Sequence, residues 1–297
     1  MRRLIFLNNP NCIQSEALIK SNKKNKKKNS EGTEEDLSID LNHLTCDHHS
    51  AFIAGFALVL PIFQNSTIQL SLIGLGGGIF PMFLHGLFNK MVIEAVEIDE
   101  VIVNVAKECF NFIEDDRMKT FTMDGIDYIK QFKENNKKTD IIILDVDSKD
   151  MSLGISCPPP AFVELEILNL LFDCVNENGM VIINLVCRST ELRGQLQEKI
   201  TEIFPQVFLM QMTYDINCIL FAFPKVLKRP LVIADITACL KQLSKTTARP
   251  LHSSVFTILE DLQMLDISKK ATGSVEAPKK QGKNQPKKQQ KRKKKRN

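Results

Sequence analysis

The stretch 71-SLIGLGGGIFPMFLHGLF-88, followed closely by 94-EAVEID-99, decides the fold class of this 297-residue chain. An apolar run ends in a loop that has four glycines in five residues, and a second apolar segment follows. Glycine lacks a Cβ, so such a loop lets its backbone approach another group closely. The pattern of strand, glycine loop and helix is typical of ligand-binding loops in open parallel sheets, although a tight turn alone would also use these glycines.

Outward from this loop, apolar runs alternate with segments of helical character. The sequence predicts strands at 68–73, 92–97, 119–122, 140–145, 180–186, 207–212 and 218–223. It predicts helices between most of them, at about 79–88, 100–110, 124–136, 160–175 and 190–203. Apolar strands that alternate with helices indicate a parallel sheet that is covered on both faces.

The last two predicted strands distinguish a methyltransferase-type sheet from a dehydrogenase-type sheet. Only a short polar link, Thr213 to Asn217, joins the last two strands, so they are expected to form a hairpin with one antiparallel strand. Seven strands with a terminal hairpin are typical of class I methyltransferases, whereas the dehydrogenase domain has six strands. We therefore expect an α/β fold with a seven-stranded, Rossmann-like sheet of the class I methyltransferase type.

The chain divides into three regions by composition. Residues 1–66 predict a small β-hairpin, a disordered lysine-rich insert at 21–36 and an entry helix. Residues 67–268 hold the predicted catalytic sheet, with helical packing after 224. Residues 269–297 are rich in Lys, Gln and Pro and predict a disordered tail.

Charge is distributed unevenly between these regions. The tail carries 13 Lys and Arg and one Glu, so the net charge of +4 hides a body near −8. An acidic body argues against a nucleic-acid-binding surface on the folded domain. The tail could contact RNA or the ribosome weakly, act as a nuclear address, or stay a solvated extension.

Other features argue against a membrane protein and against a metal site. No apolar run is long enough to span a bilayer, and the N-terminus lacks the features of a signal peptide. The eight cysteines are scattered without metal-like spacing, which indicates free thiols in a reducing compartment. We expect a soluble cytoplasmic protein without a metal.

The acidic residues that follow the strands are the candidates for ligand binding. Glu97 ends the second strand about twenty residues after the glycine loop, where a carboxylate can accept the hydroxyls of a ribose. Ile98 follows it, and Asp99 is expected to cap the next helix. Asp124 and Gly125 follow the third strand, where an adenine would lie, although Asp124 could equally be a helix cap.

Asp145 opens the run 145-DVDSKD-150 after the fourth strand and places carboxylates beside the predicted cleft. The loop 154-GISCPPPAFVE-164, stiffened by three prolines, could wall a substrate pocket near Asp145 and Asp147. His48 and His49 are interpreted as ordinary loop residues before the first helix.

The glycine pattern favours S-adenosylmethionine over a dinucleotide. A dinucleotide site has the pattern G-x-G-x-x-G, and Ile79 stands where the third glycine is expected. S-adenosylmethionine would place its methionine part beside Gly74, Gly76 and Gly78. Its ribose would lie on Glu97, and its reacting centre would lie near Asp145.

Methyl transfer is an in-line displacement at a sulfonium methyl, in which the enzyme mainly positions the nucleophile. An amine must be neutral to react. At pH 7, deprotonating an α-amine costs about 3 kcal/mol less free energy than deprotonating a lysine side chain. Asp145 and Asp147 could accept N–H bonds from such an amine without serving as a general base.

These motifs together resemble a known family. The run LSLIGLGGGIFPMFLHGLF, then AVEID, DDRMKTFTMDGIDYI, ILDVDSKDMSLGISCPPPAFVE and VIINLVCR, resembles the C-terminal domain of the methyltransferase-like protein 13 family, in the spermidine synthase-like branch. The resemblance covers roughly 2–265. It implies methylation of the N-terminal α-amine of translation elongation factor 1-alpha, which would be the protein partner.

The resemblance implies the same roles for the residues that match. Gly74, Gly76 and Glu97 would bind S-adenosylmethionine. Asp124 and Gly125 would flank adenine, and the pair Asp145 and Asp147 would border the methyl-transfer site. The family's lysine-methylating N-terminal domain has no counterpart in this sequence.

Two alternatives belong to other functional classes. A spermidine synthase-like aminopropyltransferase would use the same fold, but the segment Thr45 to His49 lacks the Tyr-Gln pair expected of a synthase. A non-catalytic binding module that acts through its basic tail would not bind S-adenosylmethionine.

Overall fold

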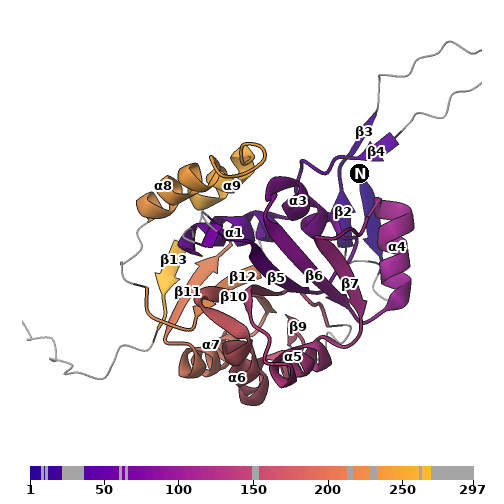
Figure 1. The fold of residues 1–297 in the computed structure, drawn as a ribbon. Coiled ribbons are helices and arrows are strands. Elements are labelled where there is room, and N and C mark those ends of the chain that lie inside the picture. The colour runs from indigo at the N-terminus through magenta and orange to yellow at the C-terminus, as the bar shows by residue number, and fades with distance from the viewer. Residues whose placement is uncertain are drawn as a thin grey trace, which may run out of the picture.

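The structure is a computed structural model that describes residues 1–7, 10, 13–21, 37–59, 62–63, 66–148, 154–212, 217–227, 233–260 and 263–268. Its centre is one twisted mixed sheet (Figure 1). The predictions of disorder for the lysine-rich insert and for the tail at 269–297 fall on residues outside this description, apart from Ser21.

The predicted seven-stranded sheet is confirmed. Its strands are β5 (Ile68–Ile73), β6 (Met91–Glu97), β7 (Met118–Thr122), β8 (Thr139–Leu144), β10 (Val175–Cys187), β11 (Gln206–Gln211) and β12 (Asn217–Phe223). They lie in the order β11-β12-β10-β8-β5-β6-β7. The strands from β7 to β10 run parallel, and β12 is antiparallel to both of its neighbours. This is the class I methyltransferase arrangement.

Two further strands enlarge the sheet. β13 (Gln263–Asp266) pairs with β11 at the edge, in a region for which the sequence predicted helical packing. β9 (Ile155–Cys157) folds back on the end of β10. Both are very short, and strands of three or four residues show too little alternation to be recognised from sequence.

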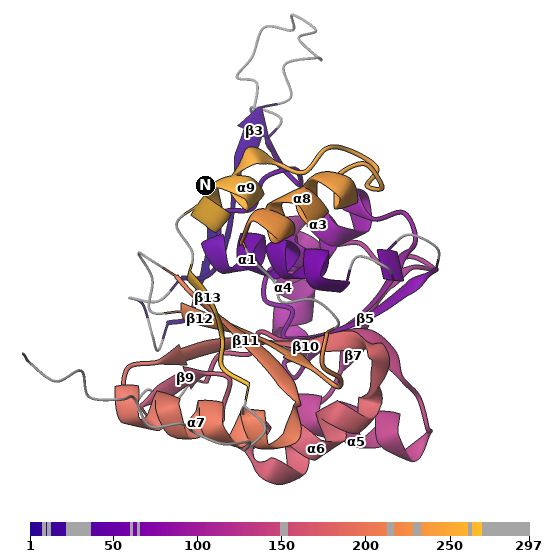
Figure 2. The same ribbon diagram turned by 90° about the vertical axis from the view of Figure 1, so that its left-hand side faces the viewer.

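Helices cover the sheet in two layers, which Figure 2 shows edge-on. One layer contains α1 (Asp47–Phe56), α3 (Ile79–Leu87), α4 (Glu100–Phe110), α8 (Ile233–Leu243) and α9 (Ser253–Glu260). The other contains α5 (Gly125–Glu134), α6 (Leu165–Cys174) and α7 (Thr190–Ile203). Each layer closes its own hydrophobic core against one face of the sheet. The helix predicted at 160–175 is interrupted, because a 3-10 turn, η4 (Pro160–Val163), precedes α6.

The N-terminal region adds two small β-ladders. β1 (Arg2–Ile5) and β2 (Ile13–Ala17) form the predicted antiparallel hairpin. β3 (Ile19–Ser21) pairs with β4 (Leu37–Ile39), so the two ends of the lysine-rich insert meet. β2 packs beside the start of α3, which brings the hairpin to the glycine loop.

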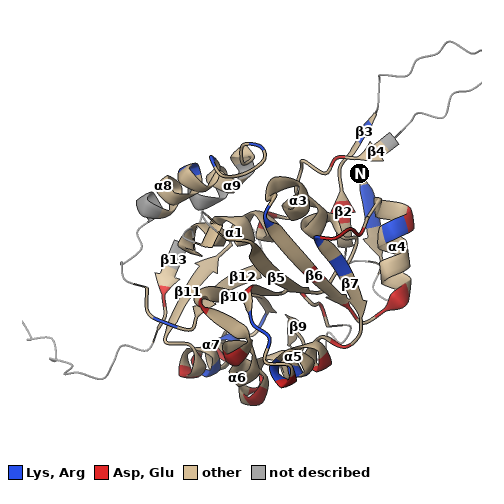
Figure 3. Cartoon of the chain, in the orientation of Figure 1, with Lys and Arg blue, Asp and Glu red and all other residues tan. Residues whose placement is uncertain are grey.

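Charged residues lie mainly on the outer helices, where both signs are mixed (Figure 3). None of the helices in the described part of the chain has the length and apolar character needed to cross a bilayer.

One glycine sets the distance between α1 and the sheet. Gly55 is buried against the ring of Phe221 on β12, and a Cβ built at Gly55 would lie 2.0 Å from the Cε1 atom of that ring. Real Cβ atoms never approach so closely, so α1 can lie this near to β12 only with glycine at this position. The placement matters because the first turn of α1 carries His48 and His49.

Gly55→Ala should lower the free energy of unfolding by about 1–3 kcal/mol, because the added methyl overpacks the contact with Phe221. Gly86→Ala is the matched control, since Gly86 is an exposed helical glycine and a Cβ there would meet no atom of the described residues within 4 Å. Because Ala has a higher helix propensity than Gly, this control variant should have a free energy of unfolding about 0.5–1 kcal/mol higher than the wild type. Chemical denaturation measures both variants, and equal effects of the two substitutions would contradict the packing assigned to Gly55.

Candidate active site

The glycine loop joins β5 to α3 at the point where the strand order reverses. Gly74 has a φ of 102°, and a Cβ there would lie 2.2 Å from the carbonyl oxygen of Asp145. The end of β5 can therefore approach the end of β8 only because Gly74 has no side chain. Gly78 caps α3 in the left-handed region with a φ of 70°. The glycines thus serve close packing within the protein, a role that is compatible with a ligand on the loop's other side.

The N-terminal hairpin holds this loop in place. The Ser15 hydroxyl accepts a hydrogen bond of 2.8 Å from the Gly77 amide and donates one to the Gln14 carbonyl. A Cβ at Gly76 would lie 2.6 Å from the same hydroxyl. Sequence reasoning missed Ser15, because nothing in a strand sixty residues away marks it as a neighbour of the loop.

Glu97 ends β6 beside the loop, as predicted. One carboxylate oxygen accepts a 3.2 Å hydrogen bond from the Leu75 amide, and the other accepts one of the same length from the Asp99 amide. Each carboxylate oxygen can accept a second bond, so the group still has capacity for hydroxyls. Next to it, the Ile98 side chain is 63% exposed, which makes it an apolar surface at the mouth of the site.

Asp99 and Asp124 both act as helix N-caps, as the sequence suggested. Asp99 accepts a 2.9 Å bond from the Val101 amide and caps α4, as expected. Asp124 accepts a 2.7 Å bond from the Ile126 amide and caps α5. Gly125 starts that helix against β5. One oxygen of Asp124 caps the helix, and the proposed adenine contact of this residue stays a prediction.

Asp145 lies at the centre of a polar network at the end of β8. Its Oδ2 lies 3.1 Å from His49 Nε2 and 3.7 Å from His48 Nε2. Its Oδ1 accepts a 2.8 Å bond from the Asn184 amide group, and the Asn184 carbonyl oxygen accepts one of 2.9 Å from the amide group of Asn217. The network joins α1, β8, β10 and β12.

The interpretation of His48 and His49 as ordinary loop residues was wrong. Both lie in the first turn of α1 and face Asp145. The His49 ring stacks on Phe80 of α3 with centroids 4.5 Å apart, and His48 packs edge-on against His49. Adjacent histidines carry no signal of this kind in the sequence, because their partner is about one hundred residues away.

The same network sets the protonation of its members. Burial and, to a smaller extent, the neighbouring His48 lower the pKa of His49 to about 4, although Asp145 opposes both effects. Burial alone would raise the pKa of Asp145, but the two imidazoles outweigh it and hold this pKa well below its usual range. At neutral pH, Asp145 is therefore a carboxylate that accepts a hydrogen bond from a neutral His49.

The remaining predicted residues follow Asp145 along the chain. Asp147 is exposed, and its Oδ2 lies 3.5 Å from the Gln14 side-chain nitrogen. Partial burial of its carboxyl and the nearby Asp145 raise the pKa of Asp147. Asp150 lies outside the described residues. The proline loop forms β9 and η4, and its role as a substrate wall stays a prediction.

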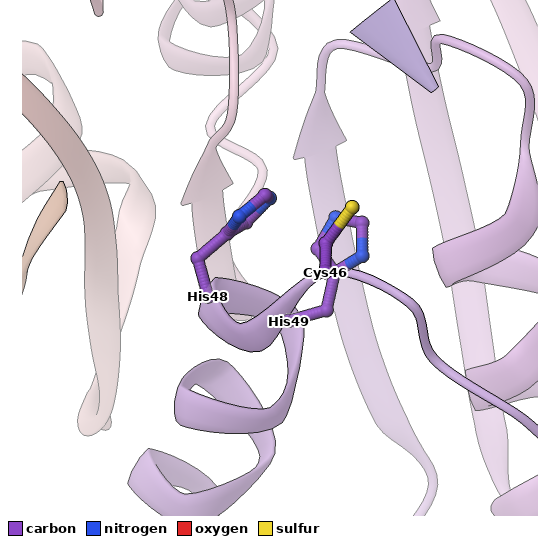
Figure 4. A group of neighbouring side chains, drawn as sticks. All are labelled: Cys46, His48 and His49. Carbon is purple, nitrogen blue, oxygen red and sulfur yellow. The ribbon is translucent and has the colours of Figure 1, made fainter. Parts of the chain in front are cut away.

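Cys46 stands beside the two histidines, as Figure 4 shows. Ligand atoms of Cys46, His48 and His49 lie within 4.8 Å of one another. The spacing C-x-H-H gave no metal signal in the sequence, because it matches no common ligand pattern. Among the described residues, this is the group of His, Cys, Asp and Glu side chains whose geometry could hold a metal ion.

The pKa of His49 predicts a pH dependence of stability. Between its folded value of about 4 and its ordinary value of 6.5, the unfolded chain binds the extra proton, so stability is lost as the pH falls through this window. The loss should reach about 3 kcal/mol at most. Urea denaturation from pH 7 to pH 4 should show a steeper loss for the wild type than for His49→Gln, and parallel curves would contradict the assignment.

Comparison with known proteins places this site in a family. Residues 41–227 match the model of the spermine/spermidine synthase domain. The chain is 38% identical over 287 residues to the eEF1A lysine and N-terminal methyltransferase of Xenopus laevis, covering 90% of this chain and 41% of that protein. It is 40% identical over 240 residues to the Homo sapiens protein of the same name, covering 74% and 34%. The chain thus spans about two fifths or less of these relatives.

A solved structure agrees with the sequence relatives. Human methyltransferase-like protein 13, crystallised with SAH, superposes with a TM-score of 0.63 at 36% sequence identity. The match covers 68% of this chain and 92% of that one. The matched domain model, which spans most of the catalytic sheet, shows that the chain belongs to the spermine/spermidine synthase domain family.

Proposed function

We propose that this chain is an S-adenosylmethionine-dependent protein methyltransferase that methylates the N-terminal α-amine of translation elongation factor 1-alpha. The observation that carries the proposal is the carboxylate of Asp145, which is oriented from both sides in a residue whose backbone carbonyl lies against the glycine loop. The names of the sequence relatives, and the SAH in the similar human structure, support the reaction and its substrate.

In this proposal the cofactor lies along the carboxyl edge of the sheet. Its methionine part lies over Gly74, Gly76 and Gly78, and its ribose hydroxyls bind the remaining acceptor capacity of Glu97. Adenine lies between the exposed Ile98 side chain and the start of α5. Support comes from the position of all these groups at the switch point of the sheet, where open α/β sheets bind ligands.

The amine enters opposite the sulfonium, beside Asp145. Its nitrogen lone pair attacks the methyl carbon, the carbon–sulfur bond breaks, and the electron pair leaves with sulfur to give neutral SAH. Because its pKa is held low, Asp145 is a weak base, so its role is to accept N–H bonds and aim the lone pair. It also stabilises the cationic product. The proton of the incoming ammonium is lost to solvent before the displacement.

An α-amine suits this mechanism better than a lysine. His49, with a pKa of about 4, and Asp145, whose pKa is held well below its usual range, are both too weakly basic to deprotonate a lysine. The α-amine has a reference pKa near 8 and needs about 3 kcal/mol less to become neutral. A translation factor as substrate would place the enzyme in the cytoplasm.

An aminopropyltransferase is the second candidate, since the family model is named for spermine and spermidine synthases. Against it, the cap and first turn of α1 bring Cys46, His48 and His49 close to Asp145 instead of the Tyr-Gln pair expected of a synthase. The binding-module alternative rests on tail residues that lie outside the described part of the chain, and any contact of this tail with RNA or the ribosome stays untested.

Glu97→Ala should abolish S-adenosylmethionine binding, because it removes the ribose acceptor and the bond that holds the Leu75 amide. Glu100→Ala is the matched control, since Glu100 is an exposed acid three residues later on α4. Isothermal titration with S-adenosylmethionine measures both variants. Equal affinities for the two variants would contradict the placement of the cofactor.

Methyl transfer should occur on a peptide with the free N-terminus of mature elongation factor 1-alpha and should not occur on its N-acetylated copy. Asp145→Asn should lower the rate on the free peptide by about 100-fold, because the amine is no longer aimed. Asp127→Asn, an exposed acid on α5, should have no effect. Radiolabel transfer from S-adenosylmethionine measures the rates.

Equal labelling of the free and acetylated peptides would overturn the α-amine as acceptor and indicate a side chain. Spermidine formation from putrescine and decarboxylated S-adenosylmethionine, with no peptide labelling, would establish the aminopropyltransferase instead.

A further inference from the structure

A cluster of three side chains with donor atoms lies beside Asp145. Cys46 precedes α1, and His48 and His49 form its first turn, so all three side chains come from one short segment. Their ligand atoms lie within 4.8 Å of one another, and Figure 4 shows the thiol beside the His49 ring. The methyl-transfer mechanism makes no use of Cys46.

The geometry is close to that of a tetrahedral metal centre. Zinc bonds of about 2.0–2.3 Å place neighbouring ligand atoms roughly 3.3–3.8 Å apart. The two Nε2 atoms lie 3.1 and 3.7 Å from the same oxygen of Asp145, so they converge on one point. The Cys46 sulfur, as a thiolate, forms a set of three ligands with the two imidazoles.

The chemistry of the donors selects the kind of ion. Imidazole and thiolate ligands suit Zn²⁺ and similar borderline metals, whereas Mg²⁺ and Ca²⁺ prefer sites built from oxygen atoms. The surrounding charge also favours a cation, because Glu16, Asp47 and Asp145 all lie near enough to act electrostatically on Cys46.

We propose that Cys46, His48 and His49 bind a divalent ion of the zinc class beside the carboxylate of Asp145. On binding, the thiol of Cys46 releases its proton to solvent and the sulfur coordinates as thiolate. Each neutral imidazole coordinates through a ring nitrogen that carries no proton and keeps its proton on the other ring nitrogen. The ion then lies beside the oxygen of Asp145 that contacts both rings. If the proposed function is right, the filled site leaves Asp145 unable to aim the amine, so the ion inhibits methyl transfer.

Co²⁺ titration of the full chain, followed by displacement with Zn²⁺, tests the site without any assay of activity. The wild type should give the absorption bands of tetrahedral Co²⁺ and a thiolate-to-cobalt charge-transfer band, with one ion per chain. Cys46→Ser should lose the charge-transfer band and at least tenfold in Zn²⁺ affinity.

Cys109→Ser should match the wild type, because Cys109 is an exposed free cysteine on α4, away from the site. Should Cys46→Ser fold poorly by circular dichroism, His48→Gln should show the same loss of Zn²⁺ affinity. Absence of the charge-transfer band in the wild type, or equal loss in Cys46→Ser and Cys109→Ser, would overturn the proposal.

The inhibitory effect has its own readout. Zn²⁺ should stop peptide methylation by the wild type, EDTA should restore it, and Cys46→Ser should keep its activity at the same Zn²⁺ concentration. If the protein gives the cobalt spectrum but Zn²⁺ does not change its methylation rate, the metal site is supported and its inhibitory role is refuted. A cobalt spectrum from a chain without methyltransferase activity would refute only the proposed function.

Discussion

The largely buried carboxylate of Asp145 is the group on which the site depends. Water reaches little of it, and it is stabilised instead by imidazole on one side and by the amide of Asn184 on the other. A charge shielded from water is tolerated only when it is paired or hydrogen-bonded. His49 comes from α1 and Asn184 from β10. The carboxylate is therefore stabilised only where the helix layer packs against this edge of the sheet. The fold and the candidate chemistry therefore share one constraint.

Two glycines make that packing possible. Gly55 lets α1 lie against Phe221, which sets the height of the histidine turn above the sheet. Gly74 lets the end of β5 touch the backbone of Asp145, which brings the loop to the carboxylate. A ligand on that loop would thus lie within reach of the same network. The N-terminal hairpin adds a third support through Ser15, outside the common sheet.

Much of the architecture could be predicted because it depends on local patterns. The strand β5, the loop after it and Glu97 follow from apolar runs, glycine and an acid at a known spacing. Asp145 was found for the same reason, since it follows an apolar strand. The partners of Asp145 could not be found in this way, because His49 is distant in sequence and only the folded sheet brings it close. Asn184 did carry a signal, since a polar residue within the apolar strand VIINLV needs a buried partner.

The central claim is that Asp145 orients an α-amine toward a sulfonium methyl group. A crystal structure of the chain with SAH and the N-terminal peptide of elongation factor 1-alpha tests it most directly. The account predicts the terminal nitrogen within hydrogen-bonding distance of Asp145 and in line with the sulfur of SAH. A lysine side chain in that position, or a peptide terminus bound away from Asp145, would contradict it.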